Sequence, residues 1–164
     1  MARKSKFNVG VIGLGIIGSR IAGSLRSAGF HVYVWNRTPK PAPNFLASPA
    51  EVAGLCDTIQ VVVADAVALF SMIEAMGTVL APRHTVICNS TVGAEATLEA
   101  ARMVESSGSK FLDAPFTGSK EAAEKAQLVY YIGGSDETLR RVEPVLKASS
   151  RAIVKIGEIG QAAW

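Results

Sequence analysis

The sequence is poor in several features that define protein classes. Its 164 residues include 2 cysteines, and 19% of them are charged and 7% aromatic. Two cysteines cannot build a disulfide scaffold, and Cys56 and Cys88 lack the spacing of a metal site, so we expect two buried thiols and no metal. A hydrophobic fraction of 49% excludes a disordered tail. A single globular domain with a full-sized core is the class that remains.

Long hydrophobic runs and an excess of one charge are also absent. The first apolar run, Phe7–Ile12, contains Gly10 and is unlike a signal peptide, and no run approaches the ~18 apolar residues of a membrane span. The 17 Lys+Arg exceed the 14 Asp+Glu only through Arg3, Lys4 and Lys6 in the first six residues. The rest of the chain is balanced in charge, without the clustered basic face of a nucleic-acid-binding protein. We therefore expect a cytoplasmic protein that binds neither membranes nor nucleic acid.

Short β-branched runs alternate with segments of helical periodicity. Strands are predicted at Phe7–Ile12, His31–Trp35, Thr58–Ala64, Thr85–Asn89, Lys110–Asp113, Leu128–Ile132 and Ala152–Ile156. Helices are predicted at Ile17–Ala28, Pro49–Leu55, Ala66–Met76, Gly93–Ser107 and Glu137–Lys147, with Pro144 kinking or shortening the last. This alternation is typical of βαβ units. The sequence predicts an α/β protein with a Rossmann-like, doubly wound, mainly parallel sheet in one domain over residues 1–164.

A glycine-rich loop joins the first predicted strand to an amphipathic helix. It reads Gly13-Leu14-Gly15-Ile16-Ile17-Gly18. In such a loop Gly13 makes the tight turn, Gly15 leaves no Cβ between the backbone and a pyrophosphate, and Gly18 lets the helix pack closely on the strand. The pyrophosphate would lie at the positive end of the helix. The pattern therefore predicts dinucleotide binding.

The end of the second predicted strand indicates which dinucleotide binds. A site for NAD usually has a carboxylate there, which binds the ribose hydroxyls, whereas Trp35-Asn36-Arg37-Thr38 contains no acid. Asn36 can bind the ribose, Arg37 can stack on adenine and pair with a 2′-phosphate, and Thr38 can donate a hydroxyl. These residues predict NADP as the cofactor. The alternative is that Arg37 is a solvated turn residue.

These motifs, together with Asp113-Ala114-Pro115-Phe116-Thr117-Gly118-Ser119-Lys120, carry a resemblance to a known family. From Asn8 to Ala163 the chain resembles the β-hydroxyacid dehydrogenases, the group of 3-hydroxyisobutyrate dehydrogenase and tartronate semialdehyde reductase. Within that group it is most similar to the NADPH-dependent glyoxylate and succinic semialdehyde reductases. The resemblance implies an N-terminal NADP-binding domain whose helical partner domain is absent. It also implies a homo-oligomeric parent enzyme and leaves the oligomeric state of this chain open.

The resemblance also implies roles for individual residues. Ala64 and Asp65 correspond to the segment of family members that lies beneath the cofactor ribose. The hydroxyl of Thr91 would lie near the nicotinamide. Where the family holds the substrate carboxylate with Ser-Gly-Gly, this chain has Thr117-Gly118-Ser119, and two later family glycines are Ala122 and Ala126. The implied cofactor contacts are Gly13, Leu14, Gly15, Ile16, Ile17, Gly18, Asn36, Arg37, Thr38, Ala64, Asp65 and Thr91.

Reduction of a carbonyl also requires a general acid. The family uses a lysine that follows a Gly-x-x-Gly turn, which Gly157-Glu158-Ile159-Gly160 matches, and its spacing places that lysine just beyond Trp164. We therefore expect no catalytic residue within this chain and little activity from it alone. Lys120 is the nearest substitute, although a solvated lysine at a helix start is the simpler interpretation. His31 begins a predicted strand and His84 precedes one, and both would point away from the ligand face.

Together these observations predict the NADPH-binding half of an oxidoreductase. The whole enzyme would transfer hydride between NADP(H) and a small aldehyde acid or 3-hydroxy acid, of the glyoxylate, succinic semialdehyde or 3-hydroxyisobutyrate type. Two alternatives stay open. One is a stand-alone, non-catalytic NADP-binding module, and the other is an enzyme similar to 6-phosphogluconate dehydrogenase.

Overall fold

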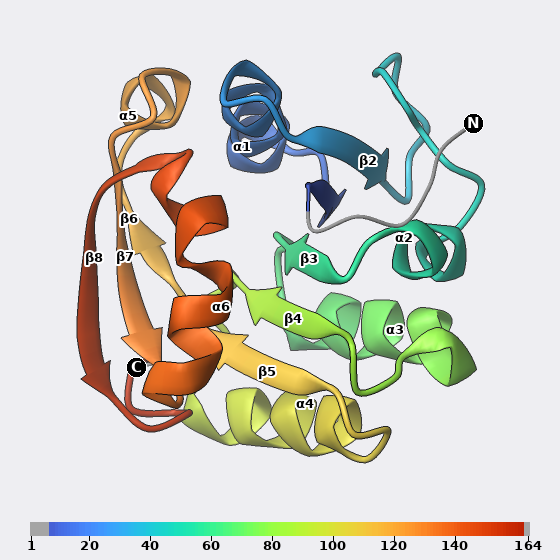
Figure 1. The fold of residues 1–164 in the computed structure, drawn as a ribbon, viewed down its shortest axis with the longest axis vertical. Coiled ribbons are helices and arrows are strands. Elements are labelled where there is room, and N and C mark those ends of the chain that lie inside the picture. The colour runs from blue at the N-terminus through green and yellow to red at the C-terminus, as the bar shows by residue number, and fades with distance from the viewer. Residues whose placement is uncertain (1–6, 163–164) are drawn as a thin grey trace.

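The computed structural model describes residues 7–162, which form one sheet with helices on both faces (Figure 1). The strands are β1 (Asn8–Ile12), β2 (His31–Trp35), β3 (Thr58–Val61), β4 (Thr85–Cys88), β5 (Lys110–Asp113), β6 (Phe116–Thr117), β7 (Leu128–Gly133) and β8 (Ser150–Gly157). The helices are α1 (Ile16–Ser27), α2 (Pro49–Leu55), α3 (Ala66–Met76), the short 3-10 helix η1 (Gly77–Val79), α4 (Ala94–Glu105), α5 (Lys120–Glu124) and α6 (Asp136–Lys147).

The sheet has the predicted mainly parallel, doubly wound order. Neighbouring strands run β2-β1-β3-β4-β5-β7-β6, and β8 pairs with β7. Strands β1 to β5 are parallel to one another, whereas β7 is antiparallel to β5 and β6. The order reverses at β1, which lies between β2 and β3, and this is where an open α/β sheet forms its ligand crevice. The Rossmann-like fold predicted from the sequence is confirmed.

Strands β6 and β7 project beyond the carboxyl ends of β1 to β5. Asp113 at the end of β5 pairs with Gly133, and β6 continues the same antiparallel register with Phe116 opposite Tyr130. Between them, the Pro115 carbonyl accepts a hydrogen bond of 2.9 Å from the Tyr131 amide. Since Asp113 is also level with the end of β4, residues 115–132 extend past the carboxyl ends of the parallel strands. We call residues 115–132 the projecting hairpin.

The helices cover the two faces of the sheet in two groups. Ile21 of α1, Ala123 of α5 and Leu146 of α6 belong to one buried hydrophobic cluster. The second cluster contains residues of α2, α3 and α4, among them Val52 and Leu69. Both clusters include strand residues, as expected for strands that are buried on both faces of a parallel sheet.

Some boundaries differ from the sequence prediction. No strand or helix was predicted between Asp113 and Leu128, where the structure has β6 and α5, and β3 ends at Val61 rather than at Ala64. Pro144 does not shorten α6, which continues to Lys147. Proline removes one helical hydrogen bond, but Val142, Val145 and Leu146 are buried around it, and their packing holds the last turn against the sheet.

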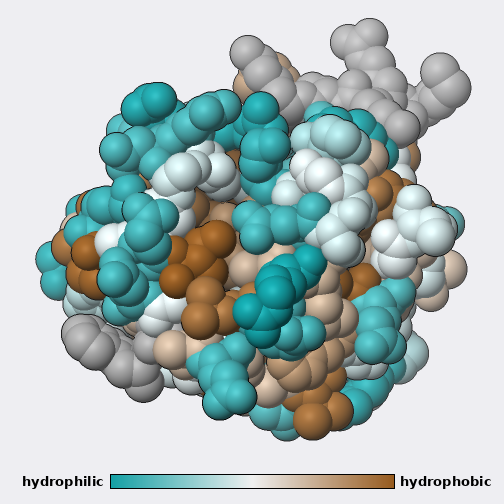
Figure 2. Space-filling view, turned by 90° about the horizontal axis from the view of Figure 1, so that it is seen from below, coloured by the Kyte–Doolittle hydropathy of each residue, from teal (hydrophilic) through white to brown (hydrophobic). Residues whose placement is uncertain are grey.

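The surface mixes hydrophobic and hydrophilic groups. On the face shown in Figure 2, seen from below Figure 1, brown hydrophobic areas lie between teal hydrophilic ones. The helices of residues 7–162 are too short or too polar for any of them to cross a membrane. Within the same residues, no three His, Cys, Asp or Glu side chains are grouped so that they could hold a metal ion.

Candidate functional site

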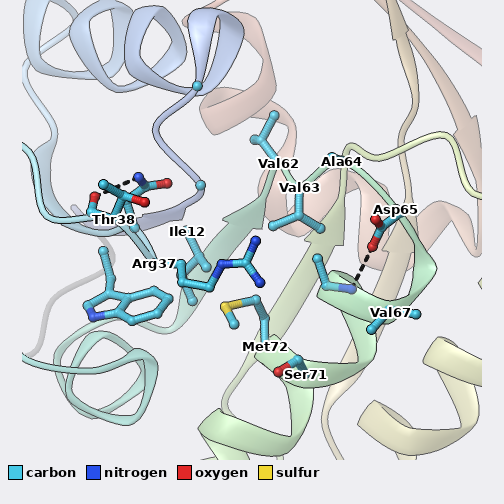
Figure 3. Close-up of a pocket in the computed structure, with 15 residues that line it drawn as sticks. Ile12, Arg37, Thr38, Val62, Val63, Ala64, Asp65, Val67, Ser71 and Met72 are labelled. Atoms are coloured by element: carbon cyan, nitrogen blue, oxygen red, sulfur yellow. Dashed lines mark hydrogen bonds between the residues drawn. The ribbon is translucent and has the colours of Figure 1, made fainter.

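A cavity of about 360 Å³ opens at the carboxyl ends of β1, β2 and β3, against α3 (Figure 3). It lies at the topological switch point, where β1 separates β2 from β3. Seven of the residues that the sequence assigned to the cofactor line it together: Gly13, Gly15, Asn36, Arg37, Thr38, Ala64 and Asp65. Leu14, Ile16, Ile17 and Gly18 belong to the same loop and to the first turn of α1 but do not line it.

Two glycines of the loop are required by the fold itself. Gly13 has a φ of +103°, and a Cβ there would lie 2.0 Å from the Val62 carbonyl oxygen. A Cβ on Gly18 would lie 1.9 Å from the carbonyl oxygen of Gly13. Any larger residue at either position would displace the backbone, so these glycines serve the tight turn and the close packing of α1.

Gly15 is different, because none of the described residues 7–162 requires a glycine there. Its φ of −72° is open to any residue, and a Cβ would have no heavy atom within 4 Å. The space that a side chain would fill faces the cavity. A glycine at this position leaves room for a ligand to approach the backbone closely.

The N-terminus of α1 has the properties of an anion site. Gly15 is the N-cap and offers no side-chain hydrogen bond, and the first turn contains no acidic residue. The first amides of a helix have no intrahelical partner, and the helix dipole makes this end positive. Nothing in the first turn of α1 neutralises that end, so a phosphate group fits there.

Asn36 fixes the glycine loop to the end of β2. Its Oδ1 accepts a hydrogen bond of 2.8 Å from the Leu14 amide, and its Nδ2 donates one of 2.8 Å to the Thr38 carbonyl. The Lys40 Nζ donates a hydrogen bond of 2.7 Å to the Leu14 carbonyl. Both backbone polar groups of Leu14 are thus bonded within the chain. Lys40 was missed by the sequence reasoning, because only the fold brings it to the loop.

Arg37 and Thr38 stand at the mouth of the cavity. The side chain of Arg37 extends into the space between Ile12 and Met72 (Figure 3). The ion pairs found within residues 7–162 do not include Arg37. Its charge is therefore available to an anionic ligand. Across the cavity, Asp65 caps α3, because its Oδ1 accepts a hydrogen bond of 2.8 Å from the Ala68 amide.

Polar side chains join the ends of β3, β4 and β5 beside the cavity. The Ser90 hydroxyl accepts a hydrogen bond of 2.9 Å from the Val63 amide. Asn89 donates one of 2.8 Å to the Ala114 carbonyl and accepts one of 2.7 Å from the Gln60 amide group. These bonds fix the segment that leads to Thr91, which is exposed and does not line the cavity.

The predicted substrate residues lie apart from this cavity, on the projecting hairpin. Thr117 is exposed at the end of β6. Gly118 has a φ of +141°, and a Cβ there would lie 2.8 Å from Leu128. The Ser119 hydroxyl caps α5 by accepting a hydrogen bond of 3.2 Å from the Ala122 amide, which gives a structural reason for a serine here. Lys120 is exposed at the start of α5.

Several titratable groups are buried outside the cavity. Burial raises the pKa of the Asp113 carboxyl to about 6, an effect partly offset by the nearby backbone amide of Gly160. Burial also lowers the pKa of His84, which bonds to the Ala81 amide and the Ala53 carbonyl at the amino end of β4. Cys56 and Cys88 are free and buried, as predicted, and burial raises the pKa of each thiol to about 12.

Comparisons with known proteins agree with this arrangement. Residues 8–157 match the family described as the NAD binding domain of 6-phosphogluconate dehydrogenase. The chain is 30% identical over 169 residues to glyoxylate/succinic semialdehyde reductase 1 of Arabidopsis thaliana, covering 94% of this chain and 57% of that protein. It is also 30% identical over 165 residues to the cytokine-like nuclear factor N-PAC of Homo sapiens, covering 94% of this chain and 30% of that protein.

A solved structure shows the same fold. The 3-hydroxyisobutyrate dehydrogenase of Mycobacterium tuberculosis, solved with L-serine, matches with a TM-score of 0.91 and 25% identity. The match covers 94% of this chain and 56% of that one. The chain therefore spans only part of the length of each protein that it matches.

Proposed function

The chain belongs to the family of the NAD-binding domain of 6-phosphogluconate dehydrogenase, and on this basis we propose that it is the NADP(H)-binding half of an oxidoreductase. The resemblance to 3-hydroxyisobutyrate dehydrogenases and to glyoxylate/succinic semialdehyde reductases is confirmed. We infer that the whole enzyme transfers hydride between NADP(H) and a small aldehyde acid or 3-hydroxy acid, of the glyoxylate, succinic semialdehyde or 3-hydroxyisobutyrate type.

The observation that carries the proposal is Gly15 at the N-terminus of α1. The protein leaves open space at its Cβ position and no cap or acid in the first turn of the helix. A pyrophosphate fits both features. It can approach the backbone closely where Gly15 has no side chain, and its negative charge is stabilised at the positive end of the helix. When bound, the nicotinamide of the dinucleotide supplies the hydride.

The preference for NADP(H) rests on Arg37 and Thr38. The end of β2 offers the dinucleotide a guanidinium and a hydroxyl, and no carboxylate that would repel a 2′-phosphate. Asn36 and Lys40 hold this segment against the glycine loop. The adenosine side of the cofactor would therefore meet the Arg37 guanidinium on a segment that is hydrogen-bonded to the glycine loop.

The substrate class follows from the relatives and from the projecting hairpin. One relative is named as a reductase of glyoxylate and succinic semialdehyde, and the M. tuberculosis enzyme was solved with L-serine, a small hydroxy acid. In this chain Thr117, Gly118 and Ser119 would bind the carboxylate of such a substrate. A clamped carboxylate holds the reacting carbon in one place, which is the main contribution that binding residues make to hydride transfer.

The proposal is tested first by substituting Gly15. Gly15→Val is expected to lower NADPH affinity about 100-fold or more, because its side chain occupies the place of the pyrophosphate. Isothermal titration gives the dissociation constant, and urea denaturation checks that the fold is intact. Gly23→Val is the matched control, since Gly23 lies on α1 and also has open space at its Cβ position. Equal NADPH affinity of Gly15→Val and Gly23→Val would refute the proposal.

The second test concerns the choice of cofactor. Arg37→Ala is expected to lower NADPH affinity about tenfold or more, the effect of losing a charge-assisted contact with a phosphate. NADH lacks that phosphate, so its affinity should change little and serves as the internal control. Titration of the wild-type chain and the variant with both cofactors gives the four constants. Comparable affinities of the wild-type chain for NADPH and NADH would contradict the preference.

One comparison supports a second candidate function. The chain is as similar to a nuclear factor as it is to a reductase, so a non-catalytic NADP-binding module is the rival proposal. The codons that follow Trp164 in the parent gene distinguish the two. A lysine just after Trp164 and a following helical domain would favour the enzyme, whereas a stop codon would favour the module. Phosphate-binding cations in that following domain would instead favour a 6-phosphogluconate-dehydrogenase-like enzyme.

A further inference from the structure

Two hydroxyl groups meet on the projecting hairpin. Thr117 on β6 and Tyr131 on β7 bring Oγ1 and the phenolic oxygen to 3.4 Å from each other. An O–H···O hydrogen bond is ordinarily 2.5–3.0 Å long, so this pair makes at best a weak bond. Both oxygens therefore retain hydrogen-bonding capacity for a third partner.

The neighbouring residue Tyr130 differs from Tyr131 in burial and in hydrogen bonding. Tyr130 is fully buried, and its hydroxyl lies 2.7 Å from the Ser149 hydroxyl and 3.5 Å from the Gln60 amide nitrogen. Tyr131 alternates to the other face of β7 and is half-buried. Beside it, in register on β8, Val154 is 41% exposed. At this position, the face of β7 that carries Tyr131 is partly open to solvent, whereas the face that carries Tyr130 is packed in the core.

The position of the pair connects it to the proposed substrate. The projecting hairpin begins at the carboxyl end of β5 and rises on the side of the sheet where the cofactor cavity lies. Thr117 is already the first residue of the proposed carboxylate clamp. Tyr131 adds a second hydroxyl from β7, which is antiparallel to β6 and whose Tyr131 amide bonds to the Pro115 carbonyl.

We infer that the Tyr131 and Thr117 hydroxyls together bind the carboxylate of the substrate, one hydrogen bond to each carboxylate oxygen. The inference rests on the proposed function and names a residue that determines specificity. Hydrogen bonds to a carboxylate are shorter and stronger than those between two neutral hydroxyls. The pair therefore favours an acid over a neutral aldehyde of the same size.

The test uses the 164-residue chain saturated with NADP+, with glyoxylate as the acid and glycolaldehyde as its neutral counterpart. NADP+ carries no hydride to transfer, so chemical-shift titration of the amides reports binding alone. Tyr131→Phe is expected to lower glyoxylate affinity about tenfold, as for one hydrogen bond to a charged group. Its affinity for glycolaldehyde and for NADP+ should stay the same. Thr117→Val should act in the same direction, and the double variant should lose more than either.

Tyr33→Phe on β2 is the matched control and should leave glyoxylate affinity unchanged. The inference is overturned if Tyr131→Phe binds glyoxylate as tightly as Tyr33→Phe, or if the NADP+-saturated wild-type chain does not bind glyoxylate. Failure of the wild-type chain to bind NADP+ at all would instead refute the proposed function. The separate NADP+ titration of each variant keeps the two results distinguishable.

Discussion

Ala126 has a backbone conformation that L-residues adopt at a cost. Its φ is +57°, just beyond the end of α5. The C-terminus of α5 is capped here, because the Gln127 amide donates a hydrogen bond of 2.7 Å to the Ala122 carbonyl. A residue in this left-handed region is usually glycine, because a Cβ is strained there. The family resemblance also places a glycine at this position.

We therefore predict that Ala126→Gly stabilises the protein by about 1 kcal/mol, after the greater freedom of glycine in the unfolded chain is considered. Urea denaturation gives the free energy of unfolding. Ala148→Gly at the C-cap of α6, where φ is −61°, should lower it. A lower stability of Ala126→Gly than of the wild-type chain would contradict the prediction.

At the residue scale, the sequence predicted the backbone environment of the loop glycines but not the hydrogen bonds that Asn36 makes within the chain. Gly13 and Gly18 have the tight backbone contacts that the motif predicts, and Gly15 has the open space. Asn36 was predicted to bind ribose, but its amide group also connects Leu14 to Thr38. That connection needs the register of β1 on β2, which spacing along the chain does not contain.

The turn after β8 lies over a buried carboxylate at the end of β5. Asp113 is fully buried, and the Gly160 amide faces it. Gly133 is also confined there, since a Cβ on it would lie 2.6 Å from the Glu158 carbonyl oxygen and 3.3 Å from Asp113 Oδ2. The Asp113 carboxyl is thus enclosed between β5, β7 and this turn, where its charged form is poorly solvated.

The pKa of Asp113 is raised in the folded state to about 6, above its ordinary value of about 3.9 in an unfolded chain. The folded protein therefore binds more protons between these values, and this contribution to stability is lost as pH rises through about 6. Asp113→Asn removes the titration. Its unfolding free energy relative to wild type should rise by about 1–3 kcal/mol between pH 4 and pH 7.5.

Denaturation of both proteins at the two pH values measures this change. His84 titrates in both, so the difference between them isolates Asp113. Asp65→Asn is the matched control, because Asp65 is an exposed helix cap and asparagine is also a good cap. A parallel pH dependence of wild type and Asp113→Asn would disprove the assignment.

At the element scale, apolar runs and caps predicted most strands and helices. Ser48 caps α2 by accepting a hydrogen bond of 3.1 Å from the Glu51 amide, with Pro49 in the first turn. β6 and α5 were missed because a two-residue strand and a five-residue helix show no periodicity. They exist because β7 and α1 supply partners for them, and such contacts between distant segments are not visible along the chain.

At the scale of the whole molecule, the described residues hold the proposed cofactor cavity and the hairpin proposed to bind the substrate, whereas the family's acid is a lysine that the resemblance places further along the chain. The resemblance places that lysine beyond Trp164, outside the described residues 7–162. We predict that the 164-residue chain binds NADPH but reduces glyoxylate and succinic semialdehyde very slowly, because the alkoxide lacks a proton donor.

NADPH absorbance with each aldehyde acid measures the rate. Rapid reduction of either substrate by this chain would contradict the prediction. In that event Lys120→Ala distinguishes the explanations, since loss of the activity with intact NADPH affinity would assign the proton donor to Lys120.

The attachment of the glycine loop also determines how the molecule meets its cofactor. Asn36 and Lys40 hold Leu14 through its amide and its carbonyl, with hydrogen bonds that lie entirely within the chain. The glycine loop therefore loses little conformational entropy when the dinucleotide binds, and this pre-organisation favours tight binding. We expect the collision of NADPH with the protein, and not a rearrangement of the loop, to limit the rate of association. The observed binding rate in a stopped-flow experiment should then increase linearly with NADPH concentration.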